Sequence, residues 1–348
     1  MLDWGSFPEG RNLLKYIRKK MNGTDSDSIA IIDFEAYSLE KDSPDKEKLP
    51  HLVDEIHHAL TTVGFFYLKN TGLATEVVIK DALEKSKTFF TSELEEKMKY
   101  TVGKVVPGSL FGYTTVNQER LNPDRDIYDL KECFNYLPDQ LEKVDPEVLK
   151  GSQKGYDMIK ALHTYFEHGR TLHHRLLEII AMGLQLEDPY FFVKKHKLCG
   201  KKGGVMNLRT LFYPGVNKSD VIDGQFRCGE HSDYGGVIFL IQDRPGLEVR
   251  NRKGHWTPAP PIDGTVVVNI GDLMQRWTSD KLVAGKHRVI LPESEEELRK
   301  SRQSIIFFGQ PDHDEIIECI DGSEKYPPIG SGEYFAQKLL SIFKKEKS

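Results

Sequence analysis

The spacing of apolar residues changes near Val205, and this change limits what the chain can fold into. Before that point apolar residues recur mainly at helical spacing, most clearly between Tyr156 and Leu184. After it, short runs rich in β-branched and aromatic residues alternate with turn signals such as Pro214-Gly215. Many short strands separated by Gly/Pro turns are typical of a sandwich or barrel. The sequence therefore predicts a mainly β fold that also contains helices.

The expected elements divide the chain into three parts that act as one functional unit. A lobe of helices and a few strands is expected at 1–200, a β core at 201–318 and a helical end at 319–348. No low-complexity linker separates these parts. Strands are expected at 29–34, 64–68, 205–213, 237–242, 265–269, 287–291 and 304–308, and helices at 52–63, 76–98, 156–184 and 334–344.

Composition excludes several classes of function. The chain has 48 Lys and Arg against 53 Asp and Glu, a net charge of −5, without the clustered basic residues that nucleic acid requires. No apolar run approaches the roughly 20 residues of a membrane span. The four cysteines are scattered, which indicates reduced thiols rather than disulfides or a thiolate metal site. Together with an N-terminus that lacks a secretory core, these features predict a cytoplasmic protein. An amphipathic transit helix stays open as an alternative because of Arg11, Lys15, Arg18, Lys19 and Lys20, although Asp3 and Glu9 argue against it.

A histidine and an aspartate at the edge of the β region are the first candidates for metal ligands. His231 and Asp233 lie in the segment GEHSD, directly before the apolar run 237–242. Residues i and i+2 of a strand point to the same face, so both side chains can reach one ion. Such a triplet is common by chance, and His313-Asp314-Glu315 is a rival that we interpret as charged surface.

A later histidine strengthens the first pair. His287 opens another β run, and two histidines with one carboxylate form the facial triad that leaves three positions of an octahedral iron(II) open. Further on, Arg302 and Ser304 begin an apolar strand. A guanidinium beside a hydroxyl suits a bidentate carboxylate partner, although an ordinary surface charge is the alternative for Arg302.

These motifs occur in an order that resembles one known family. HSDYG, GLEV, VVNIGDLMQRWTSDK, GKHRV and RQS in the second half, with IAIIDF and VGFFYLKNTG in the first, resemble the isopenicillin-N-synthase-like branch of the iron(II)/2-oxoglutarate-dependent dioxygenases. The likeness extends over roughly residues 28–318. It departs from many plant relatives at Leu211, where they carry Asn, and in the acidic insert 292–300.

The resemblance implies a fold, cofactors and roles for particular residues. The fold would be a double-stranded β-helix (jelly-roll) braced by N-terminal and C-terminal helices. His231, Asp233 and His287 would bind Fe(II), and Arg302 and Ser304, helped by Tyr213, would hold the distal carboxylate of 2-oxoglutarate. The enzyme would use O2 to oxidise a small molecule, with hydroxylation as the expected outcome and with succinate and CO2 released. No catalytic residue is expected beyond the metal ligands.

Two other functions remain open at this point. Oxidases of the same branch do not use 2-oxoglutarate yet also carry an RxS pair, so Arg302 and Ser304 do not separate the two activities. A jelly-roll can also be a binding module without catalysis, which the intact triad argues against.

The substrate pocket is the part of the site that the sequence defines least. If Tyr213 faces the cosubstrate, strand alternation turns Leu211 and Arg209 to the same interior face. A buried Arg209 needs an anionic partner, which would be either an acidic substrate or a protein Asp or Glu. Aromatic residues upstream of the core are further pocket candidates, with core packing as the alternative: Phe111, Tyr113 and Phe134.

Overall fold

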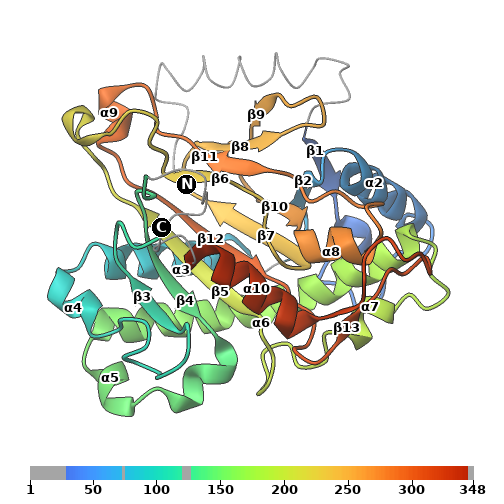
Figure 1. Cartoon of the computed structure of the whole chain (residues 1–348), viewed down its shortest axis with the longest axis horizontal. Helices are drawn as coiled ribbons and strands as arrows, with labels where there is room; N and C mark the ends of the chain where they lie inside the picture. The colour runs from blue at the N-terminus through green and yellow to red at the C-terminus, as the bar shows by residue number, and fades with distance from the viewer. Residues whose placement is uncertain (1–28, 73–74, 120–126, 344–348) are drawn as a thin grey trace.

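An eight-stranded sheet forms the centre of the computed structural model, which describes residues 29–72, 75–119 and 127–343 (Figure 1). The strand order is β1-β2-β10-β7-β12-β5-β4-β3, so strands from both halves of the chain join one sheet. Among the described strand pairs of this sheet, β1 with β2 is parallel and the others are antiparallel. The strands are β1 (Ala30–Asp33), β2 (Phe65–Lys69), β3 (Gly112–Thr114), β4 (Glu132–Tyr136), β5 (Asn207–Tyr213), β7 (Val237–Gln242), β10 (Thr265–Ile270) and β12 (Arg302–Phe308).

A second, four-stranded sheet faces the first. Its order is β6-β11-β8-β9, with β6 at Cys228–His231, β8 at Leu247–Arg250, β9 at Trp256–Pro258 and β11 at His287–Val289. Leu211 and Leu240 of the large sheet share one buried apolar cluster with Val249 and Val289 of the small sheet. Two β-sheets packed around a common interior form the jelly-roll that the family resemblance implies.

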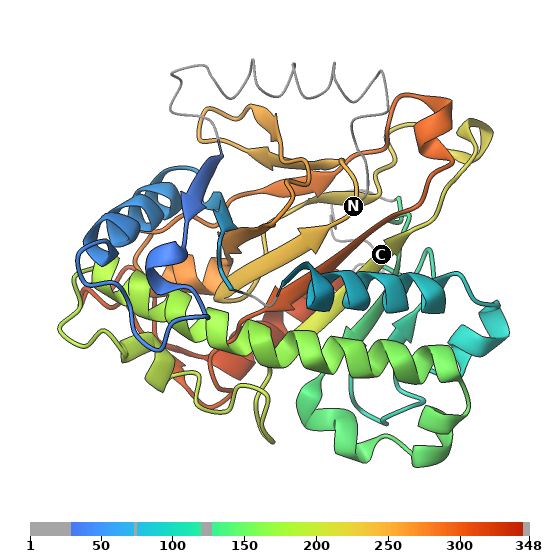
Figure 2. The same ribbon diagram turned by 180° about the vertical axis from the view of Figure 1, so that it is seen from behind.

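Helices cover the other face of the large sheet. The long helix α6 (Gln153–Gly183) runs beside α3 (Thr75–Phe90) across this face (Figure 2). Ser152 caps α6 by accepting a hydrogen bond from Gly155 N at 3.1 Å. The ring of Phe166 stacks on Phe307 of β12 with centroids 5.2 Å apart, which fixes the helix against the sheet.

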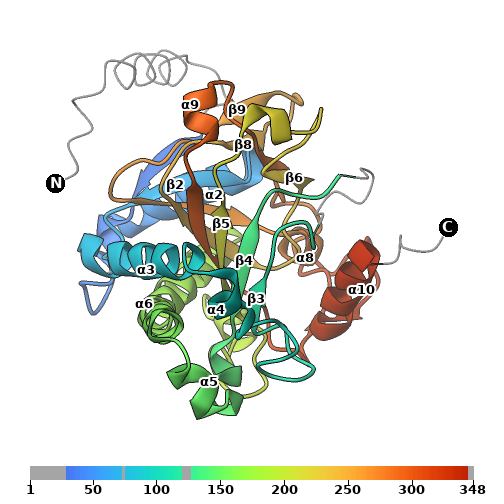
Figure 3. The same cartoon turned by 90° about the vertical axis from the view of Figure 1, so that its left-hand side faces the viewer.

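The C-terminal helix α10 (Ser331–Phe343) lies on the opposite side of the molecule from α3 and α6 (Figure 3). In the described ranges, no helix is both long enough and apolar enough to cross a membrane. Helix α2 spans Leu49–Thr62. The remaining elements are short: η2 (Glu35–Tyr37), α4 (Leu94–Met98), η3 (Pro138–Lys143), α5 (Pro146–Lys150), α7 (Phe191–Lys194), η4 (Lys218–Asp220), α8 (Asp272–Trp277), α9 (Glu295–Leu298), β13 (Ile316–Ile317) and β14 (Ile329–Gly330).

The structure differs from the sequence prediction in two places before the core. The helix expected at 76–98 is broken, because the Ser92 hydroxyl bonds the Phe89 carbonyl at 2.6 Å and Glu93 is extended, with φ −58° and ψ 146°. Strands β3 and β4 were not expected. All five residues of β4 are buried, so no polar alternation marks it as a strand in the sequence.

Candidate active site

A cavity between the two sheets contains most of the residues that the sequence singles out. Its wall is apolar for the most part and contains both histidines of the triad, Asp233 and three cationic side chains. The lining residues are Lys131, Arg209, Leu211, Tyr213, Cys228, His231, Asp233, Leu240, Leu247, His287, Val289, Arg302, Ser304, Ile306 and Phe308.

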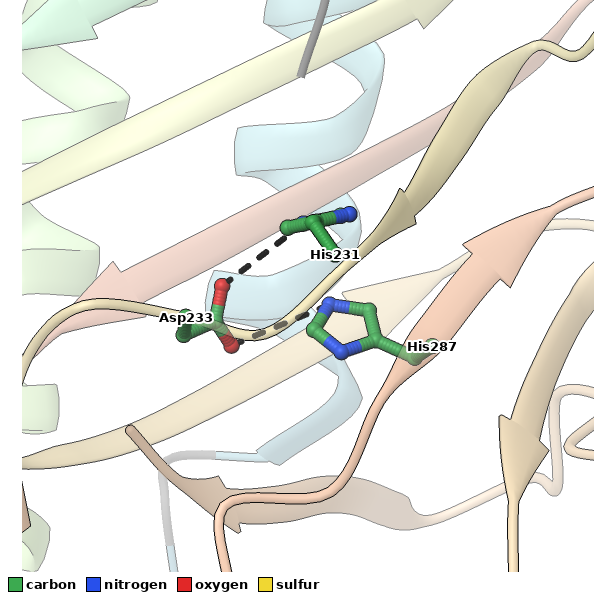
Figure 4. A group of neighbouring side chains, drawn as sticks. All are labelled: His231, Asp233 and His287. Carbon is green, nitrogen blue, oxygen red and sulfur yellow. Dashed lines mark ion pairs between the residues drawn. The ribbon is translucent and has the colours of Figure 1, made fainter. Parts of the chain in front are cut away.

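Strand pairing brings the two histidines together. His231 at the end of β6 is the register partner of His287 in β11, and their ring centroids are 4.2 Å apart. Asp233 follows β6 in the next loop; its Oδ1 lies 3.9 Å from His231 Nε2 and its Oδ2 lies 3.8 Å from His287 Nε2 (Figure 4). Among the described residues, these three alone converge as potential metal ligands, with donor atoms within 4.8 Å of one another.

Backbone carbonyls orient both imidazoles. His231 Nδ1 donates to Gly229 O at 2.8 Å, and His287 Nδ1 to Gly285 O at 3.3 Å. A carbonyl only accepts, so the proton lies on Nδ1 and the Nε2 lone pair is left for a metal. Burial and then the neighbouring His287 ring lower the pKa of His231 to about 3, which keeps that ring neutral.

Asp233 is held by a buried amide and by a tightly packed loop. Asn269 Nδ2 in β10 donates to Asp233 Oδ2 at 2.7 Å, and Asp272 N donates to Asp233 O at 2.7 Å. Gly271 passes so close to this loop that a Cβ there would lie 2.5 Å from Gly235 N. The carboxylate therefore has a fixed direction toward the two histidines.

This donor set fits iron(II). Two neutral imidazole nitrogens and one carboxylate oxygen, grouped on one side, are the ligands of mononuclear non-haem iron centres. Their open side faces the cavity that also contains Arg302, Ser304 and Tyr213. A metal held there would have free positions directed at that space.

The wall of the same cavity also has features of a carboxylate site. Arg302 is 1% exposed; its Nε donates to Arg244 O at 3.1 Å and its Nη2 to Gln242 Oε1 at 2.5 Å. Its Nη1 is buried and has no hydrogen-bond partner among the described residues. A buried guanidinium that keeps a donor unused fits an anionic ligand, because an unpaired buried charge is costly. Ser304 and Tyr213 lie beside it in the wall, and the surface-charge alternative for Arg302 is excluded.

Arg209 reaches the cavity, but it already has a protein partner. Its Nη2 bonds both carboxylate oxygens of Glu119 and lies 3.0 Å from Cys133 Sγ. Burial would raise the pKa of Glu119, but Arg209 and then Lys131 lower it to about 2. Of the two partners that the sequence left open for Arg209, the structure contains the acidic side chain. Leu211 lines the cavity as expected.

The three aromatic candidates do not line the cavity. Phe111, Tyr113 and Phe134 are each at most 1% exposed and belong to the apolar core on the helix side of the large sheet. Successive residues of β4 point to opposite faces, so Cys133 belongs to the cavity-side cluster and Phe134 to the other side. Core packing, the alternative reading of the sequence, is correct for these residues.

Sequence reasoning missed three polar residues that the fold brings to the site. Asn269 holds the Asp233 carboxylate, Gln242 holds the Arg302 guanidinium, and Lys131 lies in the cavity wall. A polar residue within or at the end of an apolar strand could have identified Asn269 and Gln242. The sequence around Lys131 contains no comparable pattern that would identify this residue. The rival triplet is surface, since the side chains of His313 and Asp314 are 61% and 99% exposed.

Comparison with known proteins identifies the class. The profile described as non-haem dioxygenase in morphine synthesis N-terminal matches residues 29–155, and that of the 2OG-Fe(II) oxygenase superfamily matches 204–311. The proline hydroxylase buaE of Petromyces alliaceus is 32% identical over 278 residues, covering 77% of this chain and 84% of that protein. The 2-oxoglutarate-Fe(II) type oxidoreductase ppzD of Metarhizium rileyi is 30% identical over 309 residues, covering 83% and 85%.

Solved structures give the same result. A full-length protein of Neurospora crassa, crystallised in complex with alpha-KG, has a TM-score of 0.76 and 30% identity, covering 91% of this chain and 97% of that one. The complex of the same protein with alpha-KG and thymine has a TM-score of 0.77 and 29% identity, covering 91% and 98%. The chain belongs to the 2OG-Fe(II) oxygenase superfamily, in its isopenicillin-N-synthase-like branch. It is an oxidoreductase, a dioxygenase that depends on iron(II) and 2-oxoglutarate.

Proposed function

We propose that this dioxygenase hydroxylates a small organic molecule in the cavity between the sheets. In this proposal His231, Asp233 and His287 hold the iron, and Arg302 binds the distal carboxylate of 2-oxoglutarate with Ser304 and Tyr213. One observation carries the assignment. A three-ligand cluster and a buried guanidinium with an unused Nη1 open into the same cavity.

The protein's own side chains perform binding, orientation and exclusion of water. When bound, iron(II) and 2-oxoglutarate supply the activation of dioxygen together with the release of succinate and CO2. Arg302 sets how far the keto acid enters, while Asn269 and the two backbone carbonyls hold the three ligands in place. Leu211, Leu240 and Ile306 line the cavity, and their apolar side chains exclude water from the reacting carbon of the substrate.

The substrate is a small molecule in this proposal. The position of Arg209 does not require this substrate to be acidic. Structures of the Neurospora crassa protein contain thymine or 5-formyluracil, and a relative is named a proline hydroxylase. The anionic partner that a buried Arg209 requires is Glu119. The argument from the sequence for an acidic substrate therefore no longer holds.

Substrate-dependent formation of succinate tests the proposal. Purified protein with iron(II), 2-oxoglutarate and O2 should release one succinate for each substrate oxidised when a metabolite library is screened. Turnover that ignores 2-oxoglutarate and yields no succinate would instead indicate an oxidase. In the absence of O2, 2-oxoglutarate should give a weak visible charge-transfer band that requires chelation of the metal.

We further propose that the chain works as one unit in the cytoplasm. The boundary expected at 200 separates segments whose strands share one sheet, in which β4 pairs with β5 and β2 with β10. Across the boundary expected at 318, β13 pairs with β14 in a separate two-stranded sheet. All four cysteines are free thiols, which suits a reducing compartment. A fluorescent fusion protein, scored by microscopy, tests the location.

A further inference from the structure

Lys131 has more hydrogen-bond donors than the described part of the chain supplies with acceptors. It lies in the cavity wall with 2% of its side chain exposed. Its Nζ is 2.8 Å from Asp129 Oδ2, but 3.7 Å from Glu119 Oε2 and 3.9 Å from Cys228 Sγ. An ammonium carries three N–H donors, and sulfur is a weak acceptor. One strong hydrogen bond therefore leaves donor capacity for a ligand in the cavity.

Asp129 fixes the position of this ammonium beside the active site. Its Oδ2 accepts from Lys131, and its Oδ1 accepts from Gly229 N of β6 at 2.9 Å. Lys131 directly precedes β4, where Glu132 is the register partner of Phe212 in β5. Lys131 is thus level with Tyr213 at the end of β5, and it is tied to the strand that ends in His231.

Lys131 is charged at neutral pH. Burial by itself would lower its pKa, but the surrounding Cys228, Asp129 and Glu119 side chains outweigh burial and raise it.

Lys97 provides a contrast on the other side of the same strand. Its Nζ donates to Glu132 at 2.6 Å and to Phe90 O at 3.0 Å, and it lies outside the cavity. The acceptors of Lys97 are all parts of the protein, as expected for a lysine with a purely structural role.

The charges around the cavity balance before any substrate enters. Two carboxylates stand behind the cations, Glu119 with Arg209 and Asp129 with Lys131. With Asp233 these carboxylates give three negative charges, which balance the three positive charges of the wall. Iron(II) carries two positive charges and 2-oxoglutarate two negative ones, so together they add no net charge. A charged substrate would leave a buried charge without compensation, which is costly. The cations and anion of the wall are Lys131, Arg209, Arg302 and Asp233.

We propose that Lys131 binds the substrate by donating a hydrogen bond to a carbonyl-type oxygen, and that this substrate has no net charge. The inference rests on the proposed function, because iron and 2-oxoglutarate enter the charge balance. Leu211, Leu240 and Ile306 provide apolar contacts for the carbon skeleton. The cavity therefore selects amides, lactams and ring carbonyls over carboxylic acids of the same shape. Lys131 is a specificity-determining residue in this assignment.

Two matched pairs of probes test the assignment on the full chain. Thymine and indole-3-acetamide are neutral and carry carbonyls, while uracil-5-carboxylate and indole-3-acetate are their anionic counterparts. Binding is measured by calorimetry without O2 on protein loaded with iron(II) and 2-oxoglutarate. At least one neutral probe should bind at least about tenfold more tightly than its acid. Lys131→Met should weaken that probe by roughly tenfold to a hundredfold, as expected for a lost hydrogen bond to a charged donor.

Controls separate substrate recognition from folding and from the proposed function. Lys131→Arg keeps the charge and should bind the probe with intermediate affinity. It replaces Lys131→Met in the test if that variant is unstable. Lys97→Met removes a buried lysine outside the cavity and should leave probe affinity unchanged. Tighter binding of the acids, unchanged binding in Lys131→Met, or no binding of any probe to protein with a normal 2-oxoglutarate band would overturn the inference. Absence of that band in the wild type would contradict the proposed function instead.

Discussion

The guanidinium of Arg302 lies over the ring of Tyr213, with Cζ 5.0 Å from the ring centroid. The two residues are register partners on the antiparallel strands β12 and β5. Burial raises the pKa of Tyr213 to about 12, so its hydroxyl stays protonated and remains a donor at neutral pH. The pair thus presents a fixed cation and a neutral hydroxyl in the wall of the cavity.

Replacing Arg302 should weaken 2-oxoglutarate far more than replacing Tyr213. Arg302→Ala should lower the affinity by about two orders of magnitude, because a charge-assisted bond to a buried carboxylate is worth a few kcal/mol. Arg302→Lys should recover only part of it, since a point charge does not reproduce the guanidinium fork. Tyr213→Phe should cost less, as it removes one hydrogen bond to a paired carboxylate. Anaerobic titration of the visible charge-transfer band measures each affinity.

Arg288 provides a matched control for this titration. It neighbours His287 in β11, pairs with Glu248 and is absent from the cavity wall. Arg288→Ala should leave the affinity for 2-oxoglutarate unchanged. Equal losses in Arg288→Ala and Arg302→Ala would contradict a specific role for Arg302.

Loss of any one triad residue should abolish iron(II) binding without unfolding the chain. His231→Ala, Asp233→Ala and His287→Ala each leave two ligands, which is too few for tight binding at this kind of site. Competition with a coloured iron(II) chelator gives the affinity, and circular dichroism checks the fold. His255→Ala should bind iron normally, because His255 does not line the cavity. Iron binding retained in His287→Ala would show that another residue is the third ligand.

Asn269 should contribute to iron affinity although it is not a ligand. Its Nδ2 donates to Asp233 Oδ2 at 2.7 Å, and the side chain is 1% exposed. Asn269→Ala should weaken iron(II) by about tenfold to a hundredfold, as is usual for partners that orient a metal ligand. Asn251 is also buried, but it accepts from His255 N away from the triad. If Asn251→Ala lowers iron affinity as much as Asn269→Ala, the effect comes from general loss of stability.

The ion pair of Arg209 with Glu119 should stabilise the fold. The two side chains are 18% and 23% exposed, so removing one partner leaves a charge in a partly buried place. Arg209→Met or Glu119→Gln should each lower the free energy of unfolding by about 1–3 kcal/mol, less than for a fully buried pair. The double variant should lose less than the sum of the single variants. Strict additivity in urea unfolding would show that the pair does not couple.

Buried histidines should make the fold sensitive to mild acid. Burial is the main cause that lowers the pKa of His196 from 6.5 to about 3 and that of His173 well below its ordinary value. Below pH 6.5 the unfolded chain binds protons that the folded chain does not. The free energy of unfolding should therefore fall by about 1.4 kcal/mol per pH unit for each such histidine as the pH decreases, and level off above pH 6.5.

Urea unfolding of the metal-free protein between pH 7.5 and 5.5 measures this slope. His196→Gln should reduce it by the contribution of one histidine. His51→Gln should leave it unchanged, because the side chain of His51 is 78% exposed. A slope that does not differ between wild type and His196→Gln would show that this ring does not control the acid response.

The sequence by itself determined the β core, and it singled out the three candidate metal ligands and the pair of Arg302 and Ser304 as predictions. These features are local: a change of apolar period, HxD before a strand, and a later histidine and arginine at strand starts. Alternation along β5 also predicted that Arg209, Leu211 and Tyr213 share the cavity face, and all three line it. Such patterns survive folding because the geometry of one strand depends little on its neighbours.

Only the tertiary structure decided which partner each polar side chain meets and which face of β4 lines the cavity. Alternation gives a strand two faces, but packing decides that Cys133 faces the cavity and Phe134 the helices. Asp129 meets Gly229, and Asn269 meets Asp233, across large separations in the sequence. The partners of Arg209 and Lys131 depend on these long-range pairings. A hydrogen bond or ion pair requires two groups within a few ångströms, and only the closed fold sets that distance.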